Sequence, residues 1–131
     1  MEKTSEFSFI LKPSKYGVGV FSVHDIKKGA HLRLFGDNET IDLRSVTRSK
    51  KDVPVSFQEY CMDREDNLIC PEDFGRMHVG WYLNHSSEPN TFRDEDFKWY
   101  ASRDIKSGEE IVIDYNSLDE PTGARDEYYS R

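Results

Sequence analysis

The chain has 131 residues, of which 36% are hydrophobic and 13% aromatic, so it is long enough to form one domain with a core. No apolar run reaches the roughly 20 residues of a membrane-spanning helix, and residues 1–6 lack the apolar stretch of a signal peptide. The net charge of −7 disfavours a nucleic-acid backbone as partner and is compatible with a basic protein or peptide, or simply with solubility. We therefore expect one soluble, intracellular domain in the cytoplasm or nucleus.

Two cysteines and four histidines are the candidate metal ligands. Cys61 and Cys70 are too few for a disulfide framework, and their separation is not that of a common zinc site. The histidines also match no common metal spacing: His24, His31, His78 and His85. No pair of nucleophile and base stands out, which disfavours a hydrolase. We expect free thiols in a reducing compartment and no metal.

The first predicted elements form a hairpin. Residues 7–11 alternate and predict a strand, residues 13–15 interrupt it, and residues 20–23 form the return strand. Gly17 and Gly19 begin that return strand, which indicates either a plain turn or a place where backbone must approach another group closely. No strand-to-helix fingerprint follows, so a dinucleotide-binding interpretation is poor.

The phrase Asp-Ile-Lys-x-Gly occurs twice, at residues 25–29 and at residues 104–108. In both copies, aliphatic residues follow three and five positions after the glycine. We infer two similar units of a turn followed by a strand, which could be related by pseudo-symmetry. Two copies at this distance do not make a solenoid.

The middle of the chain predicts short elements. Residues 37–54 are polar, with a weak strand signal at 40–43. Residues 57–62 and 68–70 predict a hairpin around a charged loop. A short helical turn is expected within 72–79 and a strand at 97–101. Many short strands and almost no long amphipathic helix predict a mainly β fold.

Residues 80–90 contain the most specific polar pattern. A buried apolar strand, Trp81 to Leu83, passes into Asn84-His85-Ser86, and Pro89 and Asn90 favour a turn. We expect the three polar residues on irregular backbone, where binding groups tend to lie. For an isolated Asn-His-Ser, a capped turn with a buried histidine is the favoured alternative.

Three motifs in fixed order carry a family resemblance: residues 16–21, residues 84–90 and residues 108–115. In this order and spacing they resemble the SET domain of protein lysine methyltransferases, across about residues 7–116, with residues 117–131 as a tail of the same single domain. The resemblance implies a β-clip fold of small sheets. It also implies a C-terminal pseudoknot, in which the second and third motifs meet around the active site.

The resemblance further implies a site for S-adenosylmethionine. Backbone around the first motif would hold the methionine part: Tyr16, Gly17, Val18 and Gly19. The second motif would contact the amino-acid and adenine portions: Asn84 and His85. Tyr115 would be the catalytic tyrosine, facing the channel in which the substrate lysine meets the methyl group. Asparagine suits this place because it offers a donor and an acceptor together.

Four residues depart from the family pattern: Trp81 for a common arginine, Ser87 for cysteine, Phe35 for tyrosine, and Ile113 where some members carry the aromatic residue that limits methylation number. The cysteine-rich zinc cluster that follows the domain in many members is absent. The tail, through Tyr128 or Tyr129, would then have to complete the channel.

The function implied is methylation of a lysine in a basic protein, such as a histone or a ribosomal protein. Tyr60 and Tyr82 are candidate walls of the lysine channel, although ordinary core aromatics are an equal alternative. The second hypothesis is an inactive SET-like module that binds a peptide. The oligomeric state, the substrate and the number of methyl groups added are not predictable from the sequence.

Overall fold

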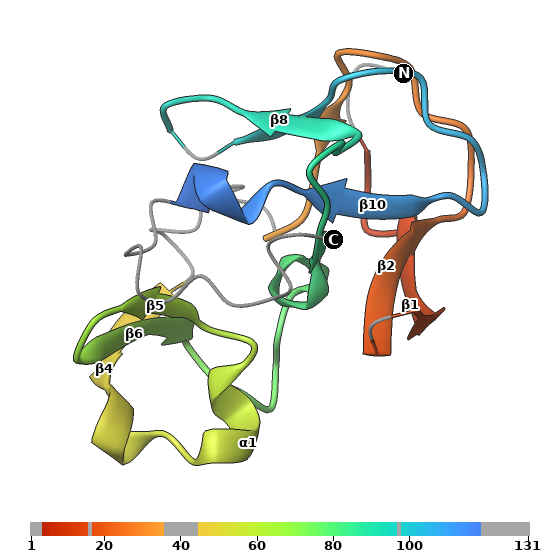
Figure 1. Cartoon of the computed structure of the whole chain (residues 1–131). Helices are drawn as coiled ribbons and strands as arrows, with labels where there is room; N and C mark the ends of the chain where they lie inside the picture. The colour runs from red at the N-terminus through yellow and green to blue at the C-terminus, as the bar shows by residue number, and fades with distance from the viewer. Residues whose placement is uncertain (1–3, 16, 36–44, 97, 119–131) are drawn as a thin grey trace.

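The computed structural model describes residues 4–15, 17–35, 45–96 and 98–118, and these residues form three small sheets (Figure 1). The strand orders are β1-β2-β10-β7, β3-β9-β8 and β4-β6-β5. The strands are β1 (Phe9–Ser14), β2 (Gly17–Ser22), β3 (His31–Leu32), β4 (Ser45–Ser49), β5 (Met62–Arg64), β6 (Asn67–Pro71), β7 (Asn84–His85), β8 (Thr91–Arg93), β9 (Trp99–Ala101) and β10 (Glu110–Ile113). The helical segments are η2 (Lys50–Asp52), α1 (Val55–Gln58), η3 (Val79–Tyr82) and η4 (Tyr115–Leu118). The predicted mainly β fold is confirmed.

The N-terminal hairpin pairs β1 with β2, from Phe9 opposite Ser22 to Ser14 opposite Gly17. The hairpin was predicted, but the strand break expected at Pro13 is wrong, because β1 continues to Ser14. An edge strand tolerates proline since the missing N–H can face solvent, and β1 is at the edge of its sheet. Gly17 has φ of 98°, which a turn residue without a Cβ adopts easily.

The two Asp-Ile-Lys-x-Gly turns, inferred to be similar units, lie against each other. Ile26 donates its backbone N–H to the Ile105 carbonyl at 2.7 Å, and Ile105 donates to Ile26 at 2.8 Å. The glycine that ends each turn has φ of 88°. Each aspartate also caps the other turn by accepting a backbone N–H: Asp25 from Ser107 at 2.9 Å, and Asp104 from Lys28 at 2.8 Å. The repeated phrase is therefore a pair of mutually capped turns.

The sheet β4-β6-β5, called the outer sheet below, lies with α1 at the lower left of Figure 1. Its β5–β6 hairpin was predicted, with a tighter turn than expected because Arg64 pairs with Asn67. Phe57 was predicted in a strand and instead lies in α1. The polar strand β4 was not predicted, and the weak strand signal at 40–43 lies outside the described residues.

The helical turn predicted within residues 72–79 is wrong in position. Most of that segment is irregular, and the helical turn is η3, which includes Trp81 and Tyr82. The buried strand expected at residues 81–83 is therefore a short 3-10 helix. Trp81 is nevertheless buried, with 5% of its surface exposed.

The core divides into a main cluster and a small one. The main cluster joins the first two sheets and η3 through buried residues that include Val20, Leu32, Trp81, Trp99 and Ile111. Beneath the outer sheet, a separate cluster contains three buried residues: Val53, Leu68 and Cys70. Because burying a large apolar side chain contributes about 1.5–3 kcal/mol, most of the stability resides in the main cluster.

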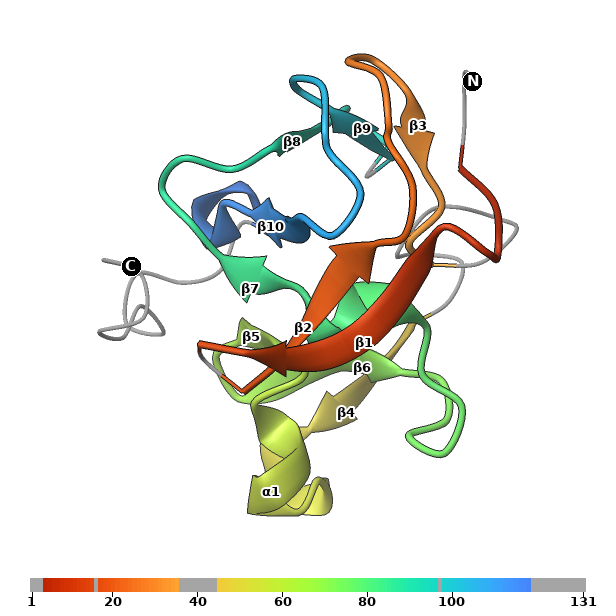
Figure 2. The ribbon, with the colours of Figure 1, turned by 90° about the vertical axis from the view of Figure 1, so that its right-hand side faces the viewer.

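In the strand order of its sheet, the C-terminal strand β10 lies between β2 and β7. Figure 2 shows β10 beside β7. It pairs antiparallel with β2 and parallel with β7, where Val112 faces Asn84 and Ile113 faces His85. The irregular backbone expected at Asn84 and His85 is wrong, since pairing with β10 extends these two residues into a strand. The crossing of residues 83–91 with β10 is called the pseudoknot below. It brings the second and third sequence motifs together, as predicted.

Candidate functional site

The Asn84 side chain occupies the centre of the first sheet, and 9% of the residue surface is exposed. Its Nδ2 donates to Oε2 of Glu110 at 2.8 Å and to the carbonyl oxygen of Val18 at 3.1 Å. These two acceptors fix the orientation of the amide, with nitrogen facing them. The Asn84 Oδ1 accepts no hydrogen bond from the described residues, so it remains an acceptor for another group.

The two glycines of the first motif, Gly17 and Gly19, are required for different structural reasons. At Gly19, an added Cβ would collide with the Glu110 carboxylate and lie 2.9 Å from Cβ of Ser14. At Gly17, no atom lies within 4 Å of an added Cβ, and the positive φ is the requirement. The sequence left open a plain turn or a close approach at these glycines, and the structure shows a turn conformation at Gly17 and a close approach at Gly19. The group that approaches Gly19 is a carboxylate of the same chain.

The His85 imidazole faces the protein interior, with none of its side chain exposed. Its Nδ1 accepts the backbone N–H of Tyr115 at 2.9 Å, so this nitrogen carries the lone pair and Nε2 carries the ring proton. Its ring centroid lies 5.1 Å from that of Tyr115. The imidazole thus holds the segment that follows β10. Because the side chain is buried, His85 would contact a ligand through its backbone.

Tyr115 begins η4 directly after β10 and is half-buried. Its hydroxyl donates to the carbonyl oxygen of Leu83 at 2.6 Å. Leu83 immediately precedes Asn84, so the phenol lies beside the same strand that presents the asparagine amide. The structure therefore brings Tyr115 close to four other predicted site residues: Val18, Gly19, Asn84 and His85. The predicted site residue Tyr16 lies outside the described residues.

Asn90 is a structural residue that the sequence showed only as a turn former. It is 1% exposed, and its Nδ2 donates to the Glu110 carbonyl at 2.8 Å and to Oε2 of Glu109 at 3.0 Å. Its Oδ1 accepts the backbone N–H of Val112 at 3.0 Å. One side chain thereby ties the turn after β7 to three residues in and just before β10: Glu109, Glu110 and Val112.

Glu109 joins the same network from its exposed side. Arg103 forms an ion pair with it at 2.6 Å. Burial raises the pKa of Glu109, but hydrogen bonds from Arg103, Asn90 and the backbone of Lys106 outweigh burial and hold the pKa below its ordinary value. Glu109 is therefore a stably ionised anchor of the pseudoknot.

The two candidate channel tyrosines pack on each other. The rings of Tyr60 and Tyr82 lie 5.3 Å apart at 60°, and the Tyr82 hydroxyl donates to the sulfur of Met77 at 3.5 Å. Burial, followed by the hydrogen bond and charge of Glu59, raises the pKa of Tyr60. Both tyrosines are half-buried, so part of each ring is exposed. Tyr82 belongs to η3, and Tyr60 lies just before β5 of the outer sheet.

Phe35 is a core residue in this chain. It is 2% exposed and packs edge-on against Trp81, with ring centroids 5.5 Å apart. Gly80 is required beside it, because a Cβ there would lie within 2.7 Å of three atoms of the Phe35 ring. The phenylalanine at this position therefore contributes packing and no hydroxyl group.

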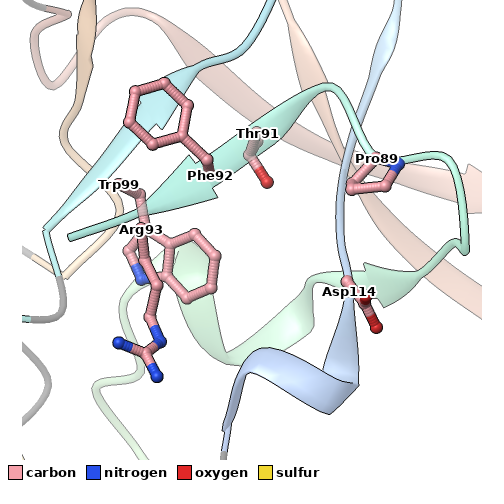
Figure 3. A pocket seen from close by; sticks show the side chains of 6 residues that line it. All are labelled: Pro89, Thr91, Phe92, Arg93, Trp99 and Asp114. Carbon is pink, nitrogen blue, oxygen red and sulfur yellow. The ribbon is translucent and has the colours of Figure 1, made fainter. Parts of the chain in front are cut away.

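A pocket of about 450 Å³ lies between β8, Trp99 of β9 and Asp114, the residue that follows β10. Pro89 and Asp114 are at one end, and Arg93 and Trp99 are at the other (Figure 3). None of the residues that line it was predicted to bind the cofactor, although Asp114 directly precedes Tyr115. The pocket is thus a neighbour of the predicted site.

The thiols and histidines form no metal centre in the described part of the chain. No group of three or more His, Cys, Asp or Glu side chains there could hold a metal ion. Cys61 and Cys70 are free, as predicted, and burial followed by the neighbouring Cys70 raises the pKa of Cys61 to about 12. No helix in the described ranges is both long and apolar enough to cross a membrane.

Comparison of the sequence with models of known protein families identifies the family of this chain. The family model described as SET domain matches residues 17–116, so the chain belongs to the SET domain family. The match contains the glycine pair, the Asn84–His85 strand and Tyr115. This assignment confirms the predicted family and fold.

One curated relative is the histone-lysine N-methyltransferase ASHH2 of Arabidopsis thaliana, which is 30% identical over 115 residues. The alignment covers 78% of this chain and 6% of the relative, so the chain spans a small part of that protein. The family therefore includes lysine methyltransferases.

Solved structures show the same fold at lower identity. A proposed histone methyltransferase of Plasmodium falciparum superimposes with a TM-score of 0.52 and 21% identity, covering 83% of this chain and 93% of that chain. KRYPTONITE, crystallised with methylated CHG DNA and SAH, superimposes with a TM-score of 0.54 and 22% identity, covering 92% of this chain and 26% of that chain.

Proposed function

We propose that this chain is an S-adenosylmethionine-dependent protein-lysine N-methyltransferase. The observation that carries the proposal is the arrangement on one short strand. Asn84 presents an oriented acceptor oxygen, and the Tyr115 hydroxyl is held at the carbonyl of the preceding residue, Leu83. The phenol of Tyr115 thus contacts the backbone of the residue next to Asn84, the proposed cofactor-binding residue.

The donor and acceptor set fits the amino-acid end of S-adenosylmethionine. That end carries an ammonium group, which needs acceptors, and the Asn84 Oδ1 is an acceptor without a partner among the described residues. Backbone of residues 16–19 would hold the methionine part, and backbone of His85 would contact the adenine portion. When bound, this cofactor supplies a methyl group on a positively charged sulfur.

The protein's own task is to present a neutral lysine amine in line with that methyl group. A lysine has an ordinary pKa of about 10.4, so the site must lower it, and desolvation between aromatic walls does so. Tyr60 and Tyr82 offer such walls, since they pack together and are half-buried. Alignment and exclusion of water then account for most of the catalysis.

We assign Tyr115 an orienting role. Its proton is donated to the Leu83 carbonyl, so its oxygen offers lone pairs toward other groups. A phenol with an ordinary pKa of about 10 is a poor general base near pH 7. The hydroxyl would therefore hold the substrate amine in position rather than remove its proton.

The substrate we propose is a lysine-rich protein, such as a histone tail or a ribosomal protein. The chain carries 25 acidic and 18 basic residues, which favours a basic partner. The relative named a histone-lysine N-methyltransferase supports the same class. An extended peptide that adds a strand to an exposed sheet edge could place its lysine in the channel.

The test is transfer of labelled methyl groups from S-adenosylmethionine to core histones and to ribosomal proteins. We expect Tyr115→Phe to lower the rate about 100-fold, since removal of one oriented polar group in an active site typically costs that much. The matched control is Tyr100→Phe on β9, which removes a hydroxyl that donates to Asp94, a residue that is not among the predicted site residues. Its rate should stay within about twofold of wild type.

Two outcomes would count against this function. A folded Tyr115→Phe variant with full activity would remove the tyrosine from the reaction. A wild-type protein that binds the cofactor but labels no lysine-rich substrate would favour the inactive, peptide-binding module. Acetylated substrates serve as the blank, because acetylation removes the amine that accepts the methyl group.

A further inference from the structure

The Glu110 carboxylate connects four segments of the first sheet and was not among the predicted site residues. Its Oε1 accepts the Ser14 hydroxyl at 2.9 Å, from β1. Its Oε2 accepts Nδ2 of Asn84 at 2.8 Å, from β7. It occupies the space that a side chain at Gly19 of β2 would need. Glu110 itself is partly buried at the start of β10.

The carboxylate decides which way the Asn84 amide faces. An asparagine amide has nearly the same shape when its oxygen and nitrogen are exchanged, so only its partners distinguish the two orientations. A flipped amide would place Oδ1 against two oxygen atoms, of Glu110 and of the Val18 carbonyl. The charged partner dominates, because hydrogen bonds to an ionised group are about twice as strong as neutral ones.

We propose that Glu110 is the positioning residue of the cofactor site. It locks Asn84 with Nδ2 inward and thereby keeps Oδ1 available for the α-ammonium group of S-adenosylmethionine. This inference rests on the proposed function and deepens it: Glu110 acts through Asn84 to make the site selective for a cofactor that carries an α-amino group. Gly19 serves the same end, since it leaves room for the carboxylate.

The first test uses Glu110→Gln, which keeps the shape and lets the new amide donate to Asn84 Oδ1. Two probes are titrated, S-adenosylhomocysteine and its analogue without the α-amino group. We expect the wild type to prefer the amine-bearing probe by about tenfold or more, and Glu110→Gln to lose most of this preference. The KM for S-adenosylmethionine should rise about tenfold, with kcat within about threefold.

The second test displaces the carboxylate without removing its charge. Gly19→Ala should force Glu110 out of contact with Asn84 and reproduce the loss of preference, which makes the test independent of the Glu110 substitution. The matched control is Glu109→Gln. Its carboxylate bonds Arg103 and Asn90 and does not contact Asn84, so the preference for the amino group should persist.

The outcomes separate this inference from the proposed function. A wild type that binds neither probe would overturn the function itself. A wild type that binds both probes equally, or a folded Glu110→Gln variant that keeps the full preference, would overturn the positioning role and leave the function standing. If Glu110→Gln does not fold, the preference of Gly19→Ala decides. Loss of the preference in this variant supports the positioning role of Glu110, and a retained preference overturns it.

Discussion

The pseudoknot and the outer sheet are held together in different ways. In the pseudoknot, β10 pairs with strands far away in sequence, and buried side chains such as Asn84, His85 and Asn90 bond backbone across the crossing. In the outer sheet, β6 pairs with both β5 and β4, all within residues 45–71, around a core of three buried residues. Figure 1 shows the outer sheet at the lower left and the pseudoknot nearer the middle of the molecule.

The difference shows where a precise site can form. Buried polar networks that are fully satisfied hold one geometry, because any shift leaves a buried group unpaired. Asn84 and His85 are held by such buried hydrogen bonds, which leave the Asn84 Oδ1 open for a ligand. Tyr60 lies between α1 and β5 of the outer sheet, whose small apolar cluster tolerates rearrangement more easily. We infer that cofactor recognition resides in the pseudoknot and that the outer sheet shapes the substrate side.

The largest expected effect comes from removing the side chain that ties the pseudoknot together. Asn90→Ala removes three buried hydrogen bonds, including those to the Val112 N–H and the Glu110 carbonyl. We expect a loss of about 3–5 kcal/mol in the free energy of unfolding, measured by urea denaturation. Asn67→Ala, at an exposed position of β6, is the matched control and should change stability by less than about 0.5 kcal/mol.

A loss below about 1 kcal/mol for Asn90→Ala would contradict the comparison, because the network would then contribute no more than an exposed contact. A large loss confined to the outer sheet, with protected amides in β10, would contradict it as well.

A smaller effect is expected in the outer sheet. Leu68 is 2% exposed and belongs to its three-residue cluster, so Leu68→Ala should cost about 2–3 kcal/mol. Hydrogen exchange should become faster in β5 and β6 and remain slow in β10. The Kd for S-adenosylmethionine should stay within about twofold of wild type. A tenfold weaker Kd in a folded variant would show that the two regions are coupled.

The smallest effect depends on pH. The pKa of Glu109 is lower in the folded protein than its ordinary value, so the ionised group stabilises the fold above that ordinary value, about 4.3. This stabilisation is lost as the pH falls through the lowered pKa. Glu109→Gln should therefore be less stable than wild type by about 1 kcal/mol at pH 7, with the difference shrinking below pH 4. A difference that is constant from pH 7 to pH 3 would show that the carboxylate charge contributes nothing.

Local signals explain what the sequence could predict. The β1–β2 hairpin and the two Asp-Ile-Lys-x-Gly turns, though not the capping of each turn by the other, follow from glycine, proline and aspartate within a few residues of the strands they join. The order of three motifs pointed to the family and to Asn84 and Tyr115. These features require no knowledge of distant partners.

The remaining features depend on partners that the sequence does not place. Glu110 accepts a hydrogen bond from Ser14, which is 96 positions away, and no pattern in either segment predicts that contact. Phe57 lies in a short apolar run, for which helix and strand cannot be told apart by periodicity. Pro13 was expected to end a strand because its place at a sheet edge was unknown. The polar strand β4 has too little apolar alternation to stand out.

The most direct test of the account is calorimetric titration of S-adenosylmethionine into the wild-type chain and into Asn84→Ala, at matched pH and salt. We predict that the wild type binds the cofactor and that the variant, shown to be folded by its circular dichroism spectrum, binds at least tenfold more weakly. Equal binding by both proteins would remove Asn84 from the site. No binding by a folded wild type would contradict the central claim that the pseudoknot forms a cofactor site.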